Sequence, residues 1–194
     1  MPIKNKKYIL IIFLLSCLFN TNLNADDFSI EAKEIIIDKE NKIIVGIGSV
    51  VAKDNEGKII NANKITYKKS EEFLLAEGDV KINDNAGNIL ITEKATYDKL
   101  KEKIITYDNS KLSLEAGYTI NAKNISYDVD RKLLRSNQST IVTDLDGNTI
   151  SASMFQYDSL NNLFSSIGQI KIIDVQKNKY FFKEIYVDTQ KREM

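Results

Sequence analysis

The segment INANKITYKKSEEFLLAEGDVKINDNAGNI, residues 60–89, is one unit of a pattern that returns every 30 residues along this chain. Apolar residues alternate with polar ones from residue 60, and the alternation changes parity between Ala62 and Ile65. A second alternating run covers residues 74–82. Alternation of this kind predicts strands with one buried face, and the change of parity predicts a bulge or a corner. Each unit is therefore expected to contain two strands and two turns.

The repeat keeps strict register from about residue 30 to the C-terminus, without insertions. Self-similarity at a fixed period predicts stacked units that bury one continuous apolar interior. No segment after residue 25 shows a sustained helical period of apolar residues, so we expect an all-β fold with no helix in the mature chain, built of five full repeats and a partial sixth. The residues expected to line the interior are Ile35, Ile65, Ile125 and Phe155; Ile44, Leu74, Ile104, Leu134 and Phe164; and Tyr67, Tyr97, Tyr127 and Tyr157.

Aspartate and glycine mark the turns between these strands. An Asp-Xaa-Xaa-Gly pattern occurs at residues 54–57, 84–87 and 144–147. Such turns are favoured because the Asp side chain bonds nearby backbone and Gly adopts a positive φ. A second aspartate column, at Asp38, Asp98, Asp128, Asp158 and Asp188, follows the tyrosine positions. Stacked carboxylates could bind Ca²⁺, but turn formation is the stronger interpretation because each Asp begins a turn and Lys68 interrupts the column.

The composition restricts the classes of function. Apolar residues make up 43% and charged residues 28% of the 194 residues, which is typical of a folded chain. The chain contains no His, which excludes Ser-His-Asp and Cys-His catalysis, and no nucleotide-binding motif occurs. The net charge is zero, which does not favour a nucleic-acid binder. We therefore expect no catalytic residue, no cofactor, no metal and no nucleic acid.

The first residues have the features of an export signal. A lysine-rich start precedes an apolar run over residues 8–19, and Ala25 comes just before an acidic pair. This order predicts a signal peptide over residues 1–25 and a mature domain over residues 26–194. A retained membrane anchor is the second interpretation, because the run is shorter than a spanning helix of roughly 20 residues. A lipoprotein cleavage before Cys17 is the third. Cleavage after Ala25 would leave a mature chain of net charge −3 with no thiol.

The interior has two interpretations from the sequence alone. Side chains of the array could fill it, as in most stacked repeats. Alternatively, the two sheets could be splayed into an open V, so that the same apolar columns form a long trough. The tyrosine column has the same ambiguity: stacked rings would fix strand register, whereas amphipathic rings would also suit a lipid groove.

The recurrent pattern A-x-x-I-x-Y, seen at residues 62–67 with Gly78-Asp79-Val80, and again at residues 122–128, resembles the OstA-like domain of the lipopolysaccharide transport proteins LptA, LptC and LptD. The resemblance covers residues 28–188. It implies a twisted, V-shaped β-jellyroll in the periplasm that carries lipopolysaccharide acyl chains in its interior. It also implies edge-strand addition to other jellyroll domains of the same transport system, and no catalysis.

The resemblance leaves two identities open. An LptC-type protein keeps a membrane anchor, which the short apolar run disfavours. An LptD-type N-terminal domain would have an outer-membrane barrel as partner, but LptD usually has cysteines, and the predicted mature chain has none. The LptD-type N-terminal domain and the free-standing LptA type both remain as interpretations. Either implies a periplasmic location, with outer-membrane association in the LptD case. A structural or adhesive β-solenoid with a filled core and no lipid is the alternative from a different class.

Overall fold

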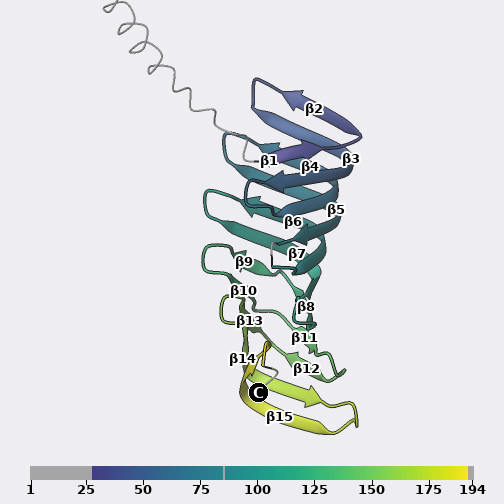
Figure 1. Cartoon of the computed structure of the whole chain (residues 1–194), viewed down its shortest axis with the longest axis vertical. Coiled ribbons are helices and arrows are strands. Elements are labelled where there is room, and N and C mark those ends of the chain that lie inside the picture. The colour runs from purple at the N-terminus through teal and green to yellow at the C-terminus, as the bar shows by residue number, and fades with distance from the viewer. Residues whose placement is uncertain (1–27, 85, 192–194) are drawn as a thin grey trace, which may run out of the picture.

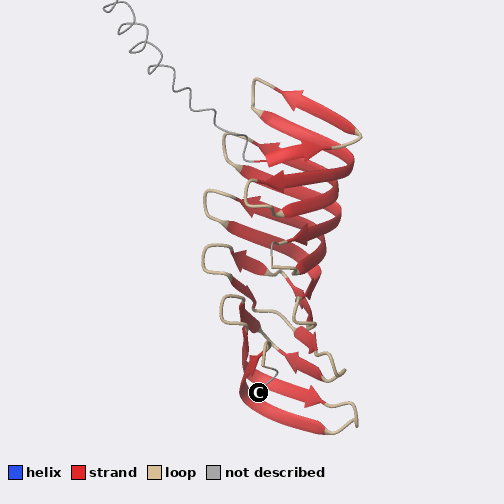
Figure 2. Ribbon diagram, in the orientation of Figure 1, coloured by secondary structure: helices blue, strands red, loops and turns tan. Residues whose placement is uncertain are grey.

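The computed structural model describes residues 28–84 and 86–191, all of them outside the predicted signal peptide. In these residues the chain forms fifteen strands and no helix (Figure 2). The strands are β1 (Phe28–Glu31), β2 (Glu34–Asp38), β3 (Ile43–Asp54), β4 (Ile59–Lys68), β5 (Phe73–Asn83), β6 (Ile89–Asp98), β7 (Lys103–Ser113), β8 (Thr119–Lys123), β9 (Ser126–Asp128), β10 (Leu133–Ser136), β11 (Thr140–Thr143), β12 (Thr149–Ala152), β13 (Phe155–Asp158), β14 (Leu163–Ile173) and β15 (Lys179–Asp188). No helix long and apolar enough to cross a membrane occurs in this part of the chain.

All strands belong to one antiparallel sheet, and the sheet bends at a corner midway along its long strands. Sequential strands lie side by side from β3 to β7, so that the sequence runs along the long axis of the molecule (Figure 1). Strands start at residues 59, 89, 119, 149 and 179, which confirms the spacing of 30 residues. The units over residues 59–118 have the expected two strands each, whereas breaks divide the next two units into four and three strands. The fold is therefore all-β, as predicted, and is of the repetitive jellyroll type.

A corner divides the long strands into two halves and the sheet into two layers. Pairing registers shift between Asn61 and Lys64 and between Glu77 and Val80, which confirms the predicted corner. Gly78 has a φ of +75° there, and the adjacent residue Asp79 also has a positive φ. A glycine adopts this conformation without the steric cost that a Cβ brings.

We call the two halves the tyrosine layer and the opposite layer. The tyrosine layer contains the half-strands with Tyr67, Tyr97, Tyr127 and Tyr157, together with β2, β9, β10 and β13. The opposite layer contains the half-strands with Ile60, Leu90, Ile120 and Ile150, together with β1, β8, β11 and β12. Buried apolar side chains from both layers meet between them as one core.

The corner is continuous in some units and interrupted in others. From β3 to β7, and again in β14 and β15, one strand passes through it without a break. Between these groups the strands are short, with breaks at residues 124–125, 137–139 and 153–154. In this middle region the two layers are joined by irregular segments.

The predicted turns are present with the expected hydrogen bonds. The backbone N–H of Gly57 donates to the Asp54 carbonyl, and Gly87 and Gly147 repeat the contact with Asp84 and Asp144. In the second aspartate column, Asp38 and Asp158 accept hydrogen bonds from the side chains of the asparagines three residues later. These carboxylates thus organise their own turns, which is the interpretation favoured by the sequence.

Candidate functional site

The interior between the two layers is the candidate site. Most of the residues expected to line it are buried there: Ile65, Ile125, Phe155, Leu74, Ile104, Leu134, Phe164, Tyr67, Tyr97, Tyr127 and Tyr157. They come from the four units over residues 60–179, because each of these units contributes the same inward positions of its strands. The interior is therefore one continuous apolar core along the long axis.

The N-terminal end of this apolar core is open. Ile35 is 45% exposed and Ile44 is only partly buried, because no unit of the described structure stacks beyond them. They line a hollow in which a water-sized sphere can occupy about 720 Å³, and Phe28 also lines it. The ring of Phe28 packs edge-on against Tyr67, 5.1 Å between centroids. Ile35 and Ile44 thus lie at the entrance of the interior, outside its enclosed part.

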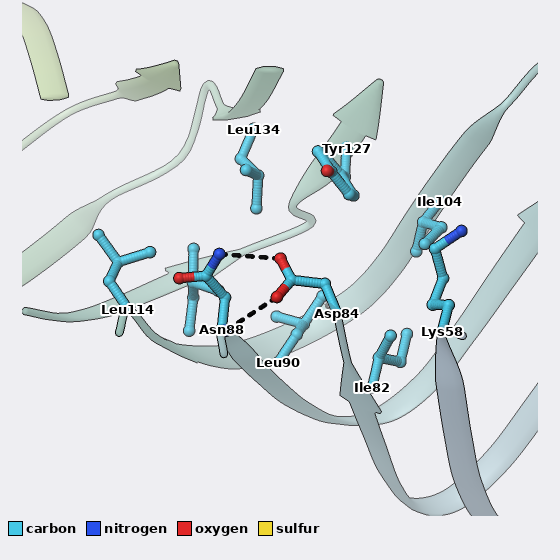
Figure 3. A pocket seen from close by; sticks show the side chains of 10 residues that line it. Lys58, Ile82, Asp84, Asn88, Leu90, Ile104, Leu114, Tyr127 and Leu134 are labelled. Atoms are coloured by element: carbon cyan, nitrogen blue, oxygen red, sulfur yellow. Dashed lines mark hydrogen bonds between the residues drawn. The ribbon is translucent and has the colours of Figure 1, made fainter. Parts of the chain in front are cut away.

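The enclosed part is densely filled by the protein's own side chains. One apolar gap lies between the layers, lined by Ile82, Leu90, Ile104, Leu112, Leu114 and Leu134, with Lys58, Asp84, Asn88 and Tyr127 at its rim (Figure 3). A water-sized sphere fits into only about 30 Å³ of it. This is space for a water molecule or two, and the apolar walls offer such waters few partners. We call this gap the central cavity.

A hollow on the outside adjoins the central cavity. A water-sized sphere can occupy about 360 Å³ of it, and Lys58, Asp84 and Tyr127 line both spaces. The hollow lies between the turns of the opposite layer and the turns of the tyrosine layer, where Lys132 and Leu160 complete it. This side of the molecule, opposite the corner, is the mouth of the bent sheet.

A buried ionic contact closes the mouth on one side of the central cavity. The Lys58 ammonium donates to Asp54 Oδ2 at 3.0 Å and to the Tyr97 hydroxyl at 3.1 Å. The Tyr97 hydroxyl donates in turn to Glu102 Oε2 at 2.7 Å. Asp54 and Lys58 belong to the opposite layer and Tyr97 and Glu102 to the tyrosine layer, so the chain of contacts spans the mouth. We call these four residues the clasp.

The clasp lies in a largely dry environment. The Asp54 and Lys58 side chains are 0% and 7% exposed, respectively. The ammonium also sits 4.5 Å from the centre of the Tyr97 ring, a cation–π distance. Burial raises the pKa of Tyr97, and the hydrogen bond to Glu102 adds to the effect. The phenol therefore stays protonated and keeps its donor role.

The tyrosines of the column do not stack on one another. Across the ladder Tyr97 faces Leu74 on one side and Ile104 on the other, and Tyr127 faces Ile104 and Leu134. Tyr97 and Tyr127 therefore pack between aliphatic side chains, and Tyr157 faces Leu134 and Phe164. No two tyrosines of the column face each other across the ladder, which corrects the interpretation of the column as stacked rings. Burial also raises the pKa values of Tyr127 and Tyr157. The rings lie inside, and the hydroxyls of Tyr97 and Tyr157 donate to Glu102 and Asn162 in the adjacent turns.

Sequence reasoning did not find the clasp, although a signal for it exists. Asn88, Asn148 and Asn178 occupy the position of Lys58 in later units, and each bonds the Asp of its own turn. Lys58 bonds Asp54 in the same way, and its longer side chain also reaches Tyr97. No group of three or more potential metal-binding side chains occurs in the described residues.

The geometry defines a class: a bent, single-sheet β-jellyroll of repeated strands, with an apolar interior that is open at one end and has a hollow beside it in the mouth. No protein-family model matches the chain, and no curated protein does. Among solved structures it is similar to LptH, described as the LptA homologous periplasmic component of the conserved lipopolysaccharide transport device from Pseudomonas aeruginosa. The two share 18% identity with a TM-score of 0.50, over 56% of this chain and 83% of that chain.

At this identity the similarity shows an LptA-like fold. The TCP10 domain of Danio rerio CPAP aligns over 77% of this chain and 99% of its own, at 11% identity and a TM-score of 0.16. The G-box domain of the microcephaly protein CPAP gives 9% identity and a TM-score of 0.22. TM-scores this low carry no argument about fold or function.

Proposed function

We propose that this protein is a periplasmic component of lipopolysaccharide transport that carries acyl chains in the interior of its jellyroll. The observation that carries the proposal is the continuous apolar interior, which opens at the Phe28 end and borders a mouth along one side. A cross-section that repeats with every unit suits a chain that slides, because no single unit forms a dedicated site. The LptA-like fold supports the same function. The proposal involves no catalysis.

Both ends of the sheet have features that suit addition of a further strand. Ile35, Ile36 and Ile37 of the edge strand β2 are 45%, 48% and 60% exposed. At the other end β15 pairs with β14 and with no second strand of the described residues, and its Phe181 is 73% exposed. A long apolar edge strand is a template for pairing with another chain. We propose that other jellyroll domains of the transport system bind these edges.

The proposal includes two finer alternatives. As an LptA-type protein the chain would act as a free periplasmic bridge. As an LptD-type N-terminal domain it would deliver lipid to an outer-membrane barrel. The coding sequence downstream of Met194 distinguishes them, since only the LptD type continues into a barrel. Cell fractionation with a C-terminal tag tests the periplasmic location and the export signal.

Photocrosslinking tests lipid carriage directly. A photoreactive amino acid at Ile125 or Leu134 faces the interior, whereas one at Asn63 or Lys123 faces solvent. We expect lipopolysaccharide crosslinks from the first pair and none from the second. Equal crosslinking from both pairs would contradict carriage in the interior.

A structural or adhesive solenoid with a filled core is the second candidate. The dense packing of the interior favours it, since water-sized space in the central cavity is only about 30 Å³. This alternative requires that no lipid enters. Mass spectrometry of the purified protein for bound lipid decides between the two, and a co-purified lipopolysaccharide would rule out the solenoid.

A further inference from the structure

We propose that the central cavity is a lateral entry site for one hydrocarbon chain of an amphiphile, and that the clasp residue Lys58 gates it. The inference rests on the proposed function and deepens it, because it assigns a place along the mouth where a chain enters. Four observations carry it: the chemistry of the cavity, its access from outside, its closed flanks and the broken strands of its wall.

The first observation is the chemistry of the cavity walls. Ile104 and Leu134 from the tyrosine layer and Leu90 from the opposite layer line the cavity (Figure 3), and Leu112 of the opposite layer completes the wall. Polar groups are confined to the rim, where Asn88 Nδ2 donates to Asp84 Oδ2 at 2.8 Å. An apolar space with polar groups only at its entrance suits a hydrocarbon tail inside and a polar head outside.

The second observation is access from outside. The hollow in the mouth and the central cavity share Lys58, Asp84 and Tyr127 as lining residues. These side chains are therefore the boundary between solvent and the interior at this point. A chain that passes between them reaches the aliphatic walls directly, whereas access from the Phe28 end runs past Tyr67 and Tyr97.

The third observation is that the mouth is closed on both flanks. On the N-terminal side the clasp joins the layers through Lys58 and Tyr97. On the C-terminal side Leu114 and Tyr118 occupy the positions that Asp84 and Asn88 have one unit earlier, and both are buried. The space between them and Val187 leaves no room for a water-sized sphere. The opening between these flanks is the port.

The fourth observation is the secondary structure of the wall. Tyr127 and Leu134 lie on β9 and β10, which are three and four residues long. Both strands end at interruptions of the corner, unlike the unbroken β4 to β7. Because no continuous strand fixes them to the opposite layer, these wall residues can move aside more easily than residues of the long strands.

Lys58 gates the port because its side chain both lines the opening and holds it closed. The equivalent residues Asn88, Asn148 and Asn178 bond only within their own turns. A Lys58→Asn variant therefore keeps a donor for Asp54 but loses the bond to Tyr97. Exposed Lys53, on the preceding strand, provides the matched control Lys53→Asn.

A fluorescence experiment tests the entry site. The chain contains no Trp, so one introduced indole is the only such reporter. A Tyr127→Trp variant places it at the port, and a Phe164→Trp variant places it in the closed part of the interior. The probe is stearic acid brominated on its chain, because bromine quenches indole on contact. We expect quenching of most of the emission in the first variant and little in the second.

The gate is tested by the rate of quenching. Adding Lys58→Asn to the Tyr127→Trp variant should accelerate quenching severalfold, and adding Lys53→Asn should leave it unchanged. Equal quenching of both reporters overturns the entry site but leaves lipid carriage standing. No quenching of either reporter overturns both proposals. A rate that is the same with Lys58→Asn and Lys53→Asn overturns the role of Lys58.

Discussion

Replacing Lys58 by Met should destabilise the protein strongly, because it leaves a buried carboxylate without its counter-ion. The Asp54 side chain is fully buried, and its Oδ2 accepts from the Lys58 ammonium. Its Oδ1 accepts from the backbone N–H groups of Glu56 and Lys58, so the carboxylate is held in place and cannot turn to solvent. Removing one partner of a buried pair costs about 3–5 kcal/mol.

The loss is measured by urea unfolding followed by circular dichroism. With a slope of about 2 kcal/mol/M, a loss of about 4 kcal/mol lowers the urea midpoint by roughly 2 M. The Lys58→Asn variant removes the same counter-ion but keeps a neutral hydrogen-bond donor for the Asp54 carboxylate, as Asn88 does for Asp84. A hydrogen bond to a charged group is worth about 1.5–3 kcal/mol, so we expect a larger shift for Met than for Asn.

A double variant isolates the cause. In Asp54→Asn with Lys58→Met the charge is gone, while the amide oxygen of the new side chain can still accept the two backbone bonds. Most of the lost stability should return. The reasoning is refuted if Lys58→Met shifts the midpoint no more than Lys58→Asn, or if the double variant is as unstable as Lys58→Met alone.

Four further predictions concern the core, the corner, the turns and the edge. Ile125→Ala empties a fully packed interior position and should lower the free energy of unfolding by about 2–5 kcal/mol in urea titrations. Gly78→Ala should cost about 1–2 kcal/mol by the same measurement, since φ is +75° and a Cβ would lie 2.9 Å from Asn63 Nδ2. The bond from Asn161 holds the pKa of Asp158 below its usual value, so this carboxylate contributes stability above about pH 4 that is lost as the pH falls through its folded pKa. The melting temperature of Asp158→Asn should accordingly lie below that of the parent protein at neutral pH. In acid the two melting temperatures should converge, as thermal melts at a series of pH values would measure. Ile36→Lys places a charge on the exposed edge strand and should reduce self-association in analytical ultracentrifugation, whereas an unchanged sedimentation profile would argue against pairing at that edge.

Features that repeat in every unit were accessible from the sequence. The fixed period and the change of parity between Ala62 and Ile65 predicted the strands, the turns and the corner, because strand patterning depends on local alternation. The Asp-Gly turns followed from local side-chain chemistry in the same way. These features depend on residues close together in the chain.

Features that depend on the distance between the layers were not accessible. Alternation tells which face is inward but not how far apart two inward faces lie, so it could not distinguish a filled interior from an open trough. The contact of Lys58 with Tyr97 joins residues 39 positions apart. The break at residues 124–125 occurs although apolar residues lie on both sides of it, at Ala122 and Ile125, whereas residues 135–140 around the break at 137–139 are all polar. The contact of Lys58 with Tyr97 and the break at residues 124–125 depend on tertiary packing, which local patterns do not encode.

The interrupted corner has a mechanical consequence. Where strands run unbroken through it, as in β4 to β7, backbone hydrogen bonds on both sides fix the angle between the layers. Across β8 to β13 that angle is set by irregular segments and side-chain packing, so the bending stiffness of the molecule is lower there. The two layers are therefore expected to separate one region at a time. Under the proposed function, an acyl chain that moves along the interior would require the two layers to separate only where the chain lies. The units with unbroken strands on either side would keep their shape.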